Sequence, residues 1–232
     1  TLLDNDKNAI PDSTKRALEL LRRHYKVVLS TGRDMDSHYS VRWKAEVAPD
    51  AIIHMNGTKI TVGDEPIFEH YMDPELLSRI YDFSMETGIC FGTTIGDRDY
   101  YTNPEKKDRA DLAFTRAIRR NYCPFSELME GKVRIHALSY AGDLDRERPM
   151  VESAFPQLEL FGFDSGVGAD VVEKGFSKAD GMKRVCAYYE VDEDRTYAFG
   201  DSENDIMIIR EAGTGIAMGN AVEHLKALAD HV

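Results

Sequence analysis

At 232 residues, with 42% hydrophobic and 30% charged side chains, the chain is long enough for one substantial core or two modest ones. Its formal net charge of -12 opposes binding to nucleic acid, because that binding depends on Lys and Arg displacing phosphate counterions. The sequence contains no run of about 18 apolar residues, and its first residues carry charges, so neither a membrane helix nor a signal peptide is expected. These features favour a cytoplasmic protein without a nucleic-acid or membrane partner, and they leave the oligomeric state open.

Cysteine and histidine spacing gives no sign of a zinc site or a disulfide framework. Cys90, Cys123 and Cys186 lie far apart and form no C-x-x-C pair. The seven histidines are scattered, and none pairs with another at the i, i+4 spacing of a helical zinc site. We expect reduced, mostly buried thiols and structural histidines.

The first sixty residues alternate between helix and strand, because apolar residues at helical spacing are followed by short continuous apolar runs. Asn56-Gly57 offers a tight turn of the kind found in hairpins. The expected elements are a helix at 11–24, a strand at 26–30, a helix that follows Thr31-Gly32-Arg33-Asp34 and runs toward Lys44, and strands at 51–55 and 59–62.

The middle of the chain has a different pattern of expected helices and strands, which predicts an inserted α+β unit. Asp73-Pro74 is typical of a helix start, and Gly88 of a helix end. The expected strands lie near 89–91, 98–102, 133–138, 158–163 and 169–172, and the expected helices at 73–88, 109–119 and 144–155.

From Ser177 the earlier alternation returns, which indicates a parallel sheet. The expected elements are a helix at 177–189, a strand at 196–199, a helix at 203–212, a strand at 215–218 and a last helix. We predict an α/β core built from residues 1–61 and 172–232, with residues 62–171 forming the inserted unit.

The most specific local signal for chemistry is Gly200-Asp201-Ser202-Glu203-Asn204-Asp205, at the point where a strand ends and a helix begins. Ligands of parallel sheets bind at such ends. Mg²⁺ prefers carboxylate oxygens, and Asp201 and Asp205 are one helical turn apart, so the pair suits a magnesium ion bridged to phosphate. The same residues also suit an ordinary turn and helix cap.

Thr31-Gly32 and Lys178 are weaker signals on their own. A hydroxyl and backbone N–H groups just past a strand can hold phosphate oxygens, but a threonine that caps a helix explains Thr31 equally well. A single lysine is usually a solvated charge. Their joint occurrence is more informative. The hydroxyl, the lysine and the paired carboxylates follow one another in this order, and all of them fall in the sheet-forming parts of the chain.

Together these stretches resemble the haloacid dehalogenase (HAD) superfamily hydrolases, specifically the Cof-type phosphatases with an inserted α/β cap of type IIB. The likeness covers nearly the whole chain. It is carried by Thr1-Leu2-Leu3-Asp4, similar to the tail of the family's opening Asp-x-Asp-Gly-Thr-Leu-Leu, by Ser30-Thr31-Gly32-Arg33, by Lys178, by the 200–205 loop, and by 213–218 and Asn220-Ala221 at the end. Ala179 stands where a glycine is expected.

The resemblance implies roles for individual residues. Thr31 and Lys178 would bind the transferring phosphoryl group, with Gly32 beside them, and Asp201 would bind Mg²⁺ while Asp205 supports the metal and the lysine. Asn204 would help to hold phosphate. Arg33 and Asn56 would face the substrate, although a hairpin turn explains Asn56 equally well.

The family's nucleophile and general acid are two aspartates expected immediately before Thr1. The first attacks phosphorus to give an aspartyl-phosphate, and the second protonates the leaving alcohol and then activates water. In the family these aspartates follow the central strand of the sheet, and without that strand its neighbours would bury unpaired backbone groups at about 1–3 kcal/mol each. We therefore expect residues upstream of Thr1, and a further short segment after Val232.

The inserted unit would determine specificity by gripping the part of the substrate remote from phosphorus. The polar candidates alternate along one expected strand, and an ordinary exposed strand face explains them about equally well; they are Lys132, Arg134 and His136. The aromatic candidates are better explained by a core; they are Tyr100, Tyr101, Phe161 and Phe163. The leading function is a Mg²⁺-dependent phosphatase of a small phosphorylated metabolite, sugar phosphates first. A sugar phosphomutase and a catalytically inactive phosphate-binding protein are the alternatives.

Overall fold

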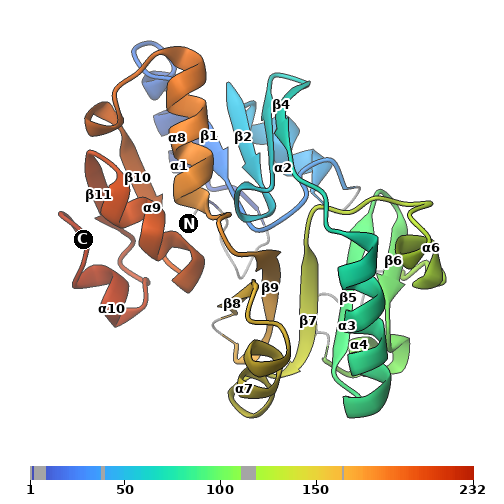
Figure 1. Cartoon of the computed structure of the whole chain (residues 1–232). Coiled ribbons are helices and arrows are strands. Elements are labelled where there is room, and N and C mark those ends of the chain that lie inside the picture. The colour runs from blue at the N-terminus through green and yellow to red at the C-terminus, as the bar shows by residue number, and fades with distance from the viewer. Residues whose placement is uncertain (1, 3–8, 38–39, 111–118, 164) are drawn as a thin grey trace. The chain divides into compact units, whose positions relative to one another are not determined.

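The computed structural model describes residues 2, 9–37, 40–110, 119–163 and 165–232, and the chain divides into two compact units. Unit 1 combines residues 1–69 and 176–232, and unit 2 comprises residues 70–175 between them (Figure 1). Strand β4 (Glu65–Glu69) pairs with β3 (Lys59–Val62) and so belongs to unit 1. The first division of the chain therefore comes after Glu69, whereas the sequence interpretation put it after residue 61.

Unit 1 contains a four-stranded sheet in the order β1-β2-β3-β4. β1 (Val28–Ser30) runs parallel to β2 (Ala51–His54), and β2 to β4 form antiparallel pairs. All four residues of β2 are buried. Ile53 packs with helix α8 (Lys178–Tyr189), while Ile52 packs with Trp43 in a separate cluster, so successive β2 side chains enter cores on opposite faces.

A second, two-stranded parallel sheet in unit 1 pairs β10 (Tyr197–Gly200) with β11 (Thr214–Ala217). Its buried alanines pack with α8 and with α9 (Ile206–Glu211). The remaining helices of unit 1 are α1 (Asp12–Leu21), α2 (Val41–Val47), α10 (Glu223–Lys226) and the short 3-10 turns η1 (Met55–Gly57), η2 (Glu193–Arg195) and η3 (Glu203–Asp205).

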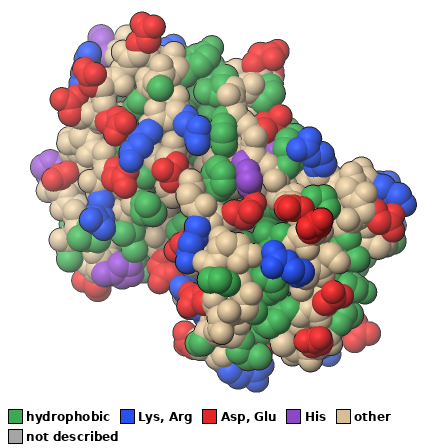
Figure 2. Space-filling view, viewed as in Figure 1, with side chains coloured by type: hydrophobic (Ala, Val, Ile, Leu, Met, Phe, Trp, Pro, Cys, Tyr) green, Lys and Arg blue, Asp and Glu red, His purple; other side chains and the backbone are tan. Residues whose placement is uncertain are grey.

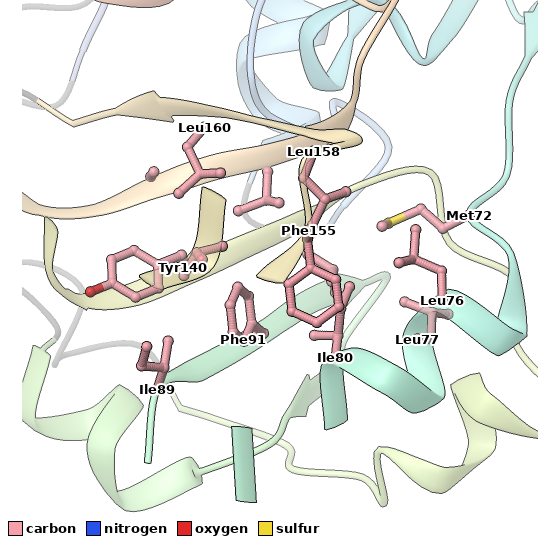
Figure 3. Packing of buried hydrophobic residues seen from close by; sticks show 14 of the residues in the cluster. Met72, Leu76, Leu77, Ile80, Ile89, Phe91, Tyr140, Phe155, Leu158 and Leu160 are labelled. Atoms are coloured by element: carbon pink, nitrogen blue, oxygen red, sulfur yellow. The ribbon is translucent and has the colours of Figure 1, made fainter. Parts of the chain in front are cut away.

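Unit 2 is an antiparallel five-stranded sheet in the order β6-β5-β7-β9-β8, packed against helices. Its strands are β5 (Cys90–Ile95), β6 (Arg98–Tyr101), β7 (Leu138–Asp143), β8 (Leu158–Gly162) and β9 (Val167–Glu173), and its helices are α3 (Pro74–Thr87), α4 (Pro104–Ala110), α6 (Ser126–Met129) and α7 (Leu144–Ala154). Figure 3 shows Leu76, Leu77 and Ile80 of α3 meeting Phe91 of β5 and Phe155. The α/β class with an inserted α+β unit is confirmed.

Two predicted elements differ from the structure, and a third falls mostly outside the described residues. The helix expected after Asp34 begins only at Val41, because the Asp34 side chain and carbonyl accept hydrogen bonds from Asp36 and Ser37 and close local turns instead. The strand expected at 133–138 begins only at Leu138. Of the helix expected at 109–119, residues 111–118 lie outside the described residues.

Sequence reasoning did not identify β4 or α6. The segment 133–137 still alternates, with Arg134 exposed and Ile135 buried, and a backbone bond from Met72 to Ile135 holds it. The alternating polar pattern therefore predicted which side chains are exposed, but the segment does not form the strand that the pattern also suggested.

Lys and Arg side chains are interspersed with Asp and Glu over the visible face of the molecule (Figure 2). No helix among the described residues is both long and apolar enough to cross a membrane.

Candidate active site

The predicted site residues of unit 1 follow the carboxyl ends of parallel strands. Thr31 follows β1, Asn56 lies two residues past β2, and Asp201 follows β10. Carboxyl ends are where open α/β sheets bind ligands. The topology therefore collects these polar side chains from three separate stretches of sequence.

Lys178 is the buried cation at the centre of this group. It is the first residue of α8, whose preceding Ser177 caps the helix by accepting the Asp180 N–H. The Lys178 ammonium donates to Asp205 Oδ1 at 2.6 Å and to Asn204 Oδ1 at 2.9 Å. A buried ammonium requires such partners, because an uncompensated charge in the interior is strongly destabilising.

Asn204 connects the lysine to the turn after β2. Its Nδ2 donates to Asn56 Oδ1 at 3.1 Å, while its Oδ1 accepts from Lys178. Asn56 N in turn donates to the Thr31 carbonyl at 3.1 Å. A continuous chain of hydrogen bonds thus runs from the Thr31 backbone through both asparagines to Lys178.

The Asn56 turn has a backbone that few sequences can adopt. Asn56 has φ 55° and Gly57 has φ 93°, and both are buried. A Cβ added at Gly57 would lie 2.2 Å from the carbonyl oxygen of Ser177. Asparagine tolerates left-handed φ and glycine permits the close approach, so Asn56-Gly57 is more than a hairpin turn because it brings β2 against the start of α8.

Asp205 organises the loop after β10. Its Oδ2 accepts the N–H groups of Asp201 and Ser202, and with Ser202 it forms a capping box at η3. A Cβ at Gly200 would lie 2.4 Å from Asp205 Cβ, so the glycine makes room for this side chain. Asp205 thereby fixes both the loop backbone and Lys178.

The carboxylates differ in what they offer to a cation. Both oxygens of Asp205 already accept protein donors, which suits a supporting role better than direct coordination. Asp201 is only partly buried, and its Oδ2 accepts from Asn220 Nδ2 at 3.2 Å. Mg²⁺ prefers carboxylate oxygens and keeps several waters, so the partly exposed carboxylate of Asp201 fits that ion.

A second group with metal-ligand spacing, Asp34, Asp36 and His54, is explained by hydrogen bonds. Burial alone would raise the pKa of Asp36, but hydrogen bonds from Lys44 and Lys59 outweigh it and lower the pKa to about 2. Both ring nitrogens of His54 have partners inside the protein. These contacts favour a structural cluster over a metal centre.

The remaining predicted positions lie beside the hydrogen-bonded chain. Thr31 Oγ1 accepts the Arg33 N–H at 3.1 Å across Gly32, and this leaves the hydroxyl proton for donation to a ligand oxygen. The Arg33 guanidinium lies 5.2 Å from the centre of the Trp43 ring. Its backbone is near the site, and its side chain contacts an aromatic neighbour.

In unit 2 the polar and aromatic candidates divide differently. The Arg134 guanidinium lies 3.7 Å from the centre of the Tyr71 ring, which stacks on His136 at 4.3 Å. Lys132 is exposed and pairs with Glu130. Tyr100, Tyr101 and Phe161 are buried core residues, whereas Phe163 is exposed.

Sequence reasoning overlooked two contributors, His54 and Asn220. His54 is the polar last residue of an otherwise apolar strand, and that change in polarity was the available signal. Asn220 belonged to the matched closing pattern, but nothing in the spacing indicated its contact with Asp201.

Comparisons with known proteins identify the family and support the fold of the chain. The family model described as haloacid dehalogenase-like hydrolase matches residues 1–232. The Bacillus subtilis protein named "Putative phosphatase YkrA" is 30% identical over 100% of this chain and 88% of its own length.

Among solved structures, the HAD subclass IIB sugar phosphatase BT4131 superposes with a TM-score of 0.86 at 26% identity, covering 100% of this chain and 89% of that one. BT1666 from Bacteroides thetaiotaomicron superposes with a TM-score of 0.87 at 23% identity, covering 100% and 85%, which supports the fold alone. The full-length family match, together with the 30% identity to the Bacillus subtilis protein, establishes that the chain belongs to the haloacid dehalogenase-like hydrolases.

Proposed function

We propose that the chain is a Mg²⁺-dependent phosphatase that hydrolyses a small phosphorylated metabolite, with sugar phosphates as the first substrate class. The observation that carries the proposal is the buried Lys178 ammonium, held between Asp205 and Asn204 at the carboxyl ends of parallel strands. The sugar class rests on the sugar phosphatase that this chain resembles in fold.

In the proposed reaction, Lys178 offsets the negative charge of the transferring phosphoryl group. The Thr31 hydroxyl donates to one of its oxygens, since Thr31 Oγ1 already accepts the Arg33 N–H and can turn its own proton outward. Asn204 and Asn56, through their mutual hydrogen bond, hold the lysine in place relative to residues 31–35, here called the Thr31 loop. Preorganised donors of this kind act where charge develops in the transition state.

Mg²⁺ would be held by Asp201, with Asp205 orienting the loop that carries it. A bound Mg²⁺ supplies charge stabilisation at phosphate oxygens. The attacking carboxylate and the acid that protonates the leaving alcohol are, in this proposal, the two aspartates expected just before Thr1. Reaction then passes through an aspartyl-phosphate that water hydrolyses.

The test is release of inorganic phosphate from a panel of sugar, cofactor and nucleotide phosphates, with Mg²⁺ and again with a chelator. The proposal predicts metal-dependent release that is fastest with a sugar phosphate. Isomerisation of a sugar phosphate without phosphate release would instead identify a mutase. Phosphate binding without turnover of any substrate would identify an inactive binding protein.

A further inference from the structure

His54, the last residue of β2, is a buried polar side chain to which the proposed reaction assigns no task. It is 0% exposed. Its Nδ1 lies 3.1 Å from Met35 N, and its Nε2 lies 3.2 Å from Thr61 Oγ1. Thr61 pairs with Ile52, two residues before His54, so all three side chains lie on the face of the sheet that carries the Trp43 cluster.

The hydrogen bonds assign the tautomer of this imidazole. A backbone N–H can only donate, so Nδ1 must accept from Met35 and the ring proton resides on Nε2. Nε2 then donates to the Thr61 hydroxyl. His54 therefore connects the Thr31 loop on one side to β3 on the other.

The Met35 bond completes a set of tethers along the Thr31 loop. Thr31 N donates to the Ile53 carbonyl at 2.9 Å, and Met55 N donates to the Arg33 carbonyl at 3.3 Å. These bonds fix the first and third residues of the loop, and His54 Nδ1 fixes the fifth. Each tether ends on residues 53–55, the segment that leads directly into Asn56.

His54 also stands at the start of the strained turn. Its own φ is -88°, whereas Met55 and Asn56 have φ values of 46° and 55°. A left-handed backbone at two successive non-glycine residues persists only when surrounding contacts hold it in place. The imidazole supplies one such contact, immediately before the turn.

We propose that His54 is a positioning residue of the phosphoryl site: through Nδ1 it holds the Thr31 loop in place relative to the Asn56 turn. This inference rests on the proposed function. An imidazole that merely filled the core would depend on its volume and burial. A positioning role depends specifically on an acceptor at the place of Nδ1.

Two substitutions separate these roles. In His54→Asn the amide oxygen can occupy the place of Nδ1 and accept from Met35, whereas in His54→Gln the amide reaches the place of Nε2 and the Met35 N–H loses its acceptor. We expect His54→Asn to keep kcat within about threefold of the unsubstituted chain, and His54→Gln to lower kcat about 10- to 100-fold with little change in KM. The exposed His24→Gln is the matched control and should leave kcat unchanged.

A second readout does not need turnover. Trp43 is the single tryptophan, and Arg33 of the Thr31 loop lies 5.2 Å from its ring, so its emission reports the loop arrangement. The emission should shift in His54→Gln and stay unchanged in His54→Asn and in the control His24→Gln.

Equal losses of kcat in the Asn and Gln variants, or an unchanged kcat and emission in His54→Gln, would overturn the positioning role. If the unsubstituted chain releases no phosphate from any substrate, the proposed function fails. The emission comparison still decides whether His54 sets the loop.

Discussion

Each unit pairs a lysine with a buried carboxylate, and the two clusters differ in what surrounds them. In unit 1, Lys178 lies between Asp205 and Asn204, and Asp205 also accepts two backbone N–H groups of the loop after β10. In unit 2, Lys106 donates to Glu147 at 3.2 Å, and Glu147 also accepts from Arg146 at 2.7 Å and from the Tyr140 hydroxyl.

The unit 2 cluster has the electrostatics of a structural network. Burial, and then the hydrogen bond and charge of Glu147, raise the pKa of Tyr140. Burial alone would raise the pKa of Glu147, but bonds from Tyr140, Arg146 and Lys106 lower it. A buried carboxylate paired with a lysine therefore does not by itself identify a site. The distinguishing feature of unit 1 is position, because its cluster follows the ends of parallel strands and connects to loops.

The largest expected effect comes from Asp201, the unit 1 carboxylate that we propose holds Mg²⁺. Asp201→Asn should reduce Mg²⁺-dependent phosphate release by about 10³-fold, because a neutral amide holds the ion weakly and less charge is offset in the transition state. Circular dichroism should show an intact fold. The exposed Asp64→Asn is the control, and full activity in Asp201→Asn would remove Asp201 from the metal site.

A second change tests whether the close approach at the turn matters. Gly57→Ala would place a Cβ 2.2 Å from the Ser177 carbonyl at φ 93°, so we expect a loss of about 3 kcal/mol in the free energy of unfolding, together with loss of activity. Gly63→Ala has a φ of 58° but meets no atom within 4 Å, and should lose only about 1 kcal/mol. Urea denaturation measures both, and equal losses would mean that backbone strain alone matters.

Tyr140→Phe probes the unit 2 network. It removes a hydroxyl that donates to the buried Glu147, so we expect a loss of about 1–3 kcal/mol in the free energy of unfolding with phosphate release unchanged. The exposed Tyr188→Phe is the control in the same denaturation series. A large loss of activity without a loss of stability would place this network in the catalytic machinery.

The smallest effect concerns Asp36. Burial raises the pKa of this carboxyl, but hydrogen bonds from Lys44 and Lys59 outweigh burial and lower the pKa to about 2. A depressed folded-state pKa gives stability that is present above the unfolded value of about 3.9 and is lost as pH falls through about 2. Because Asp36 is partly exposed, Asp36→Asn should cost less than about 1 kcal/mol at pH 7. The difference between the two chains should shrink between pH 4 and pH 2 in urea denaturation, and a constant difference would contradict the ion-pair explanation.

Much of the fold could be predicted from local patterns. Asp73, Pro74 and Gly88 bound α3 as their types predict, with Gly88 at φ 73°. The short apolar runs of unit 1 became β1, β2, β10 and β11. These patterns succeed because the period of the side chains and the chemistry of caps are local properties.

Other features depended on contacts between distant residues. The helix expected after Asp34 starts late because that side chain bonds to its own loop, and residues 133–137 lack a strand ladder although their side chains alternate. In the site, the family resemblance implied that Asp205 supports Lys178, but the bond between Asn204 and Asn56 spans 148 positions and left no trace in local sequence. The same holds for His54, whose partners come from two other segments.

The most direct test compares the two lysines in one assay. We predict that Lys178→Met abolishes Mg²⁺-dependent phosphate release, whereas Lys106→Met lowers the stability of the fold but keeps the release rate of the unsubstituted chain. Loss of release in both variants at equal stability, or retention in Lys178→Met, would contradict the assignment of the unit 1 cluster as the phosphoryl site.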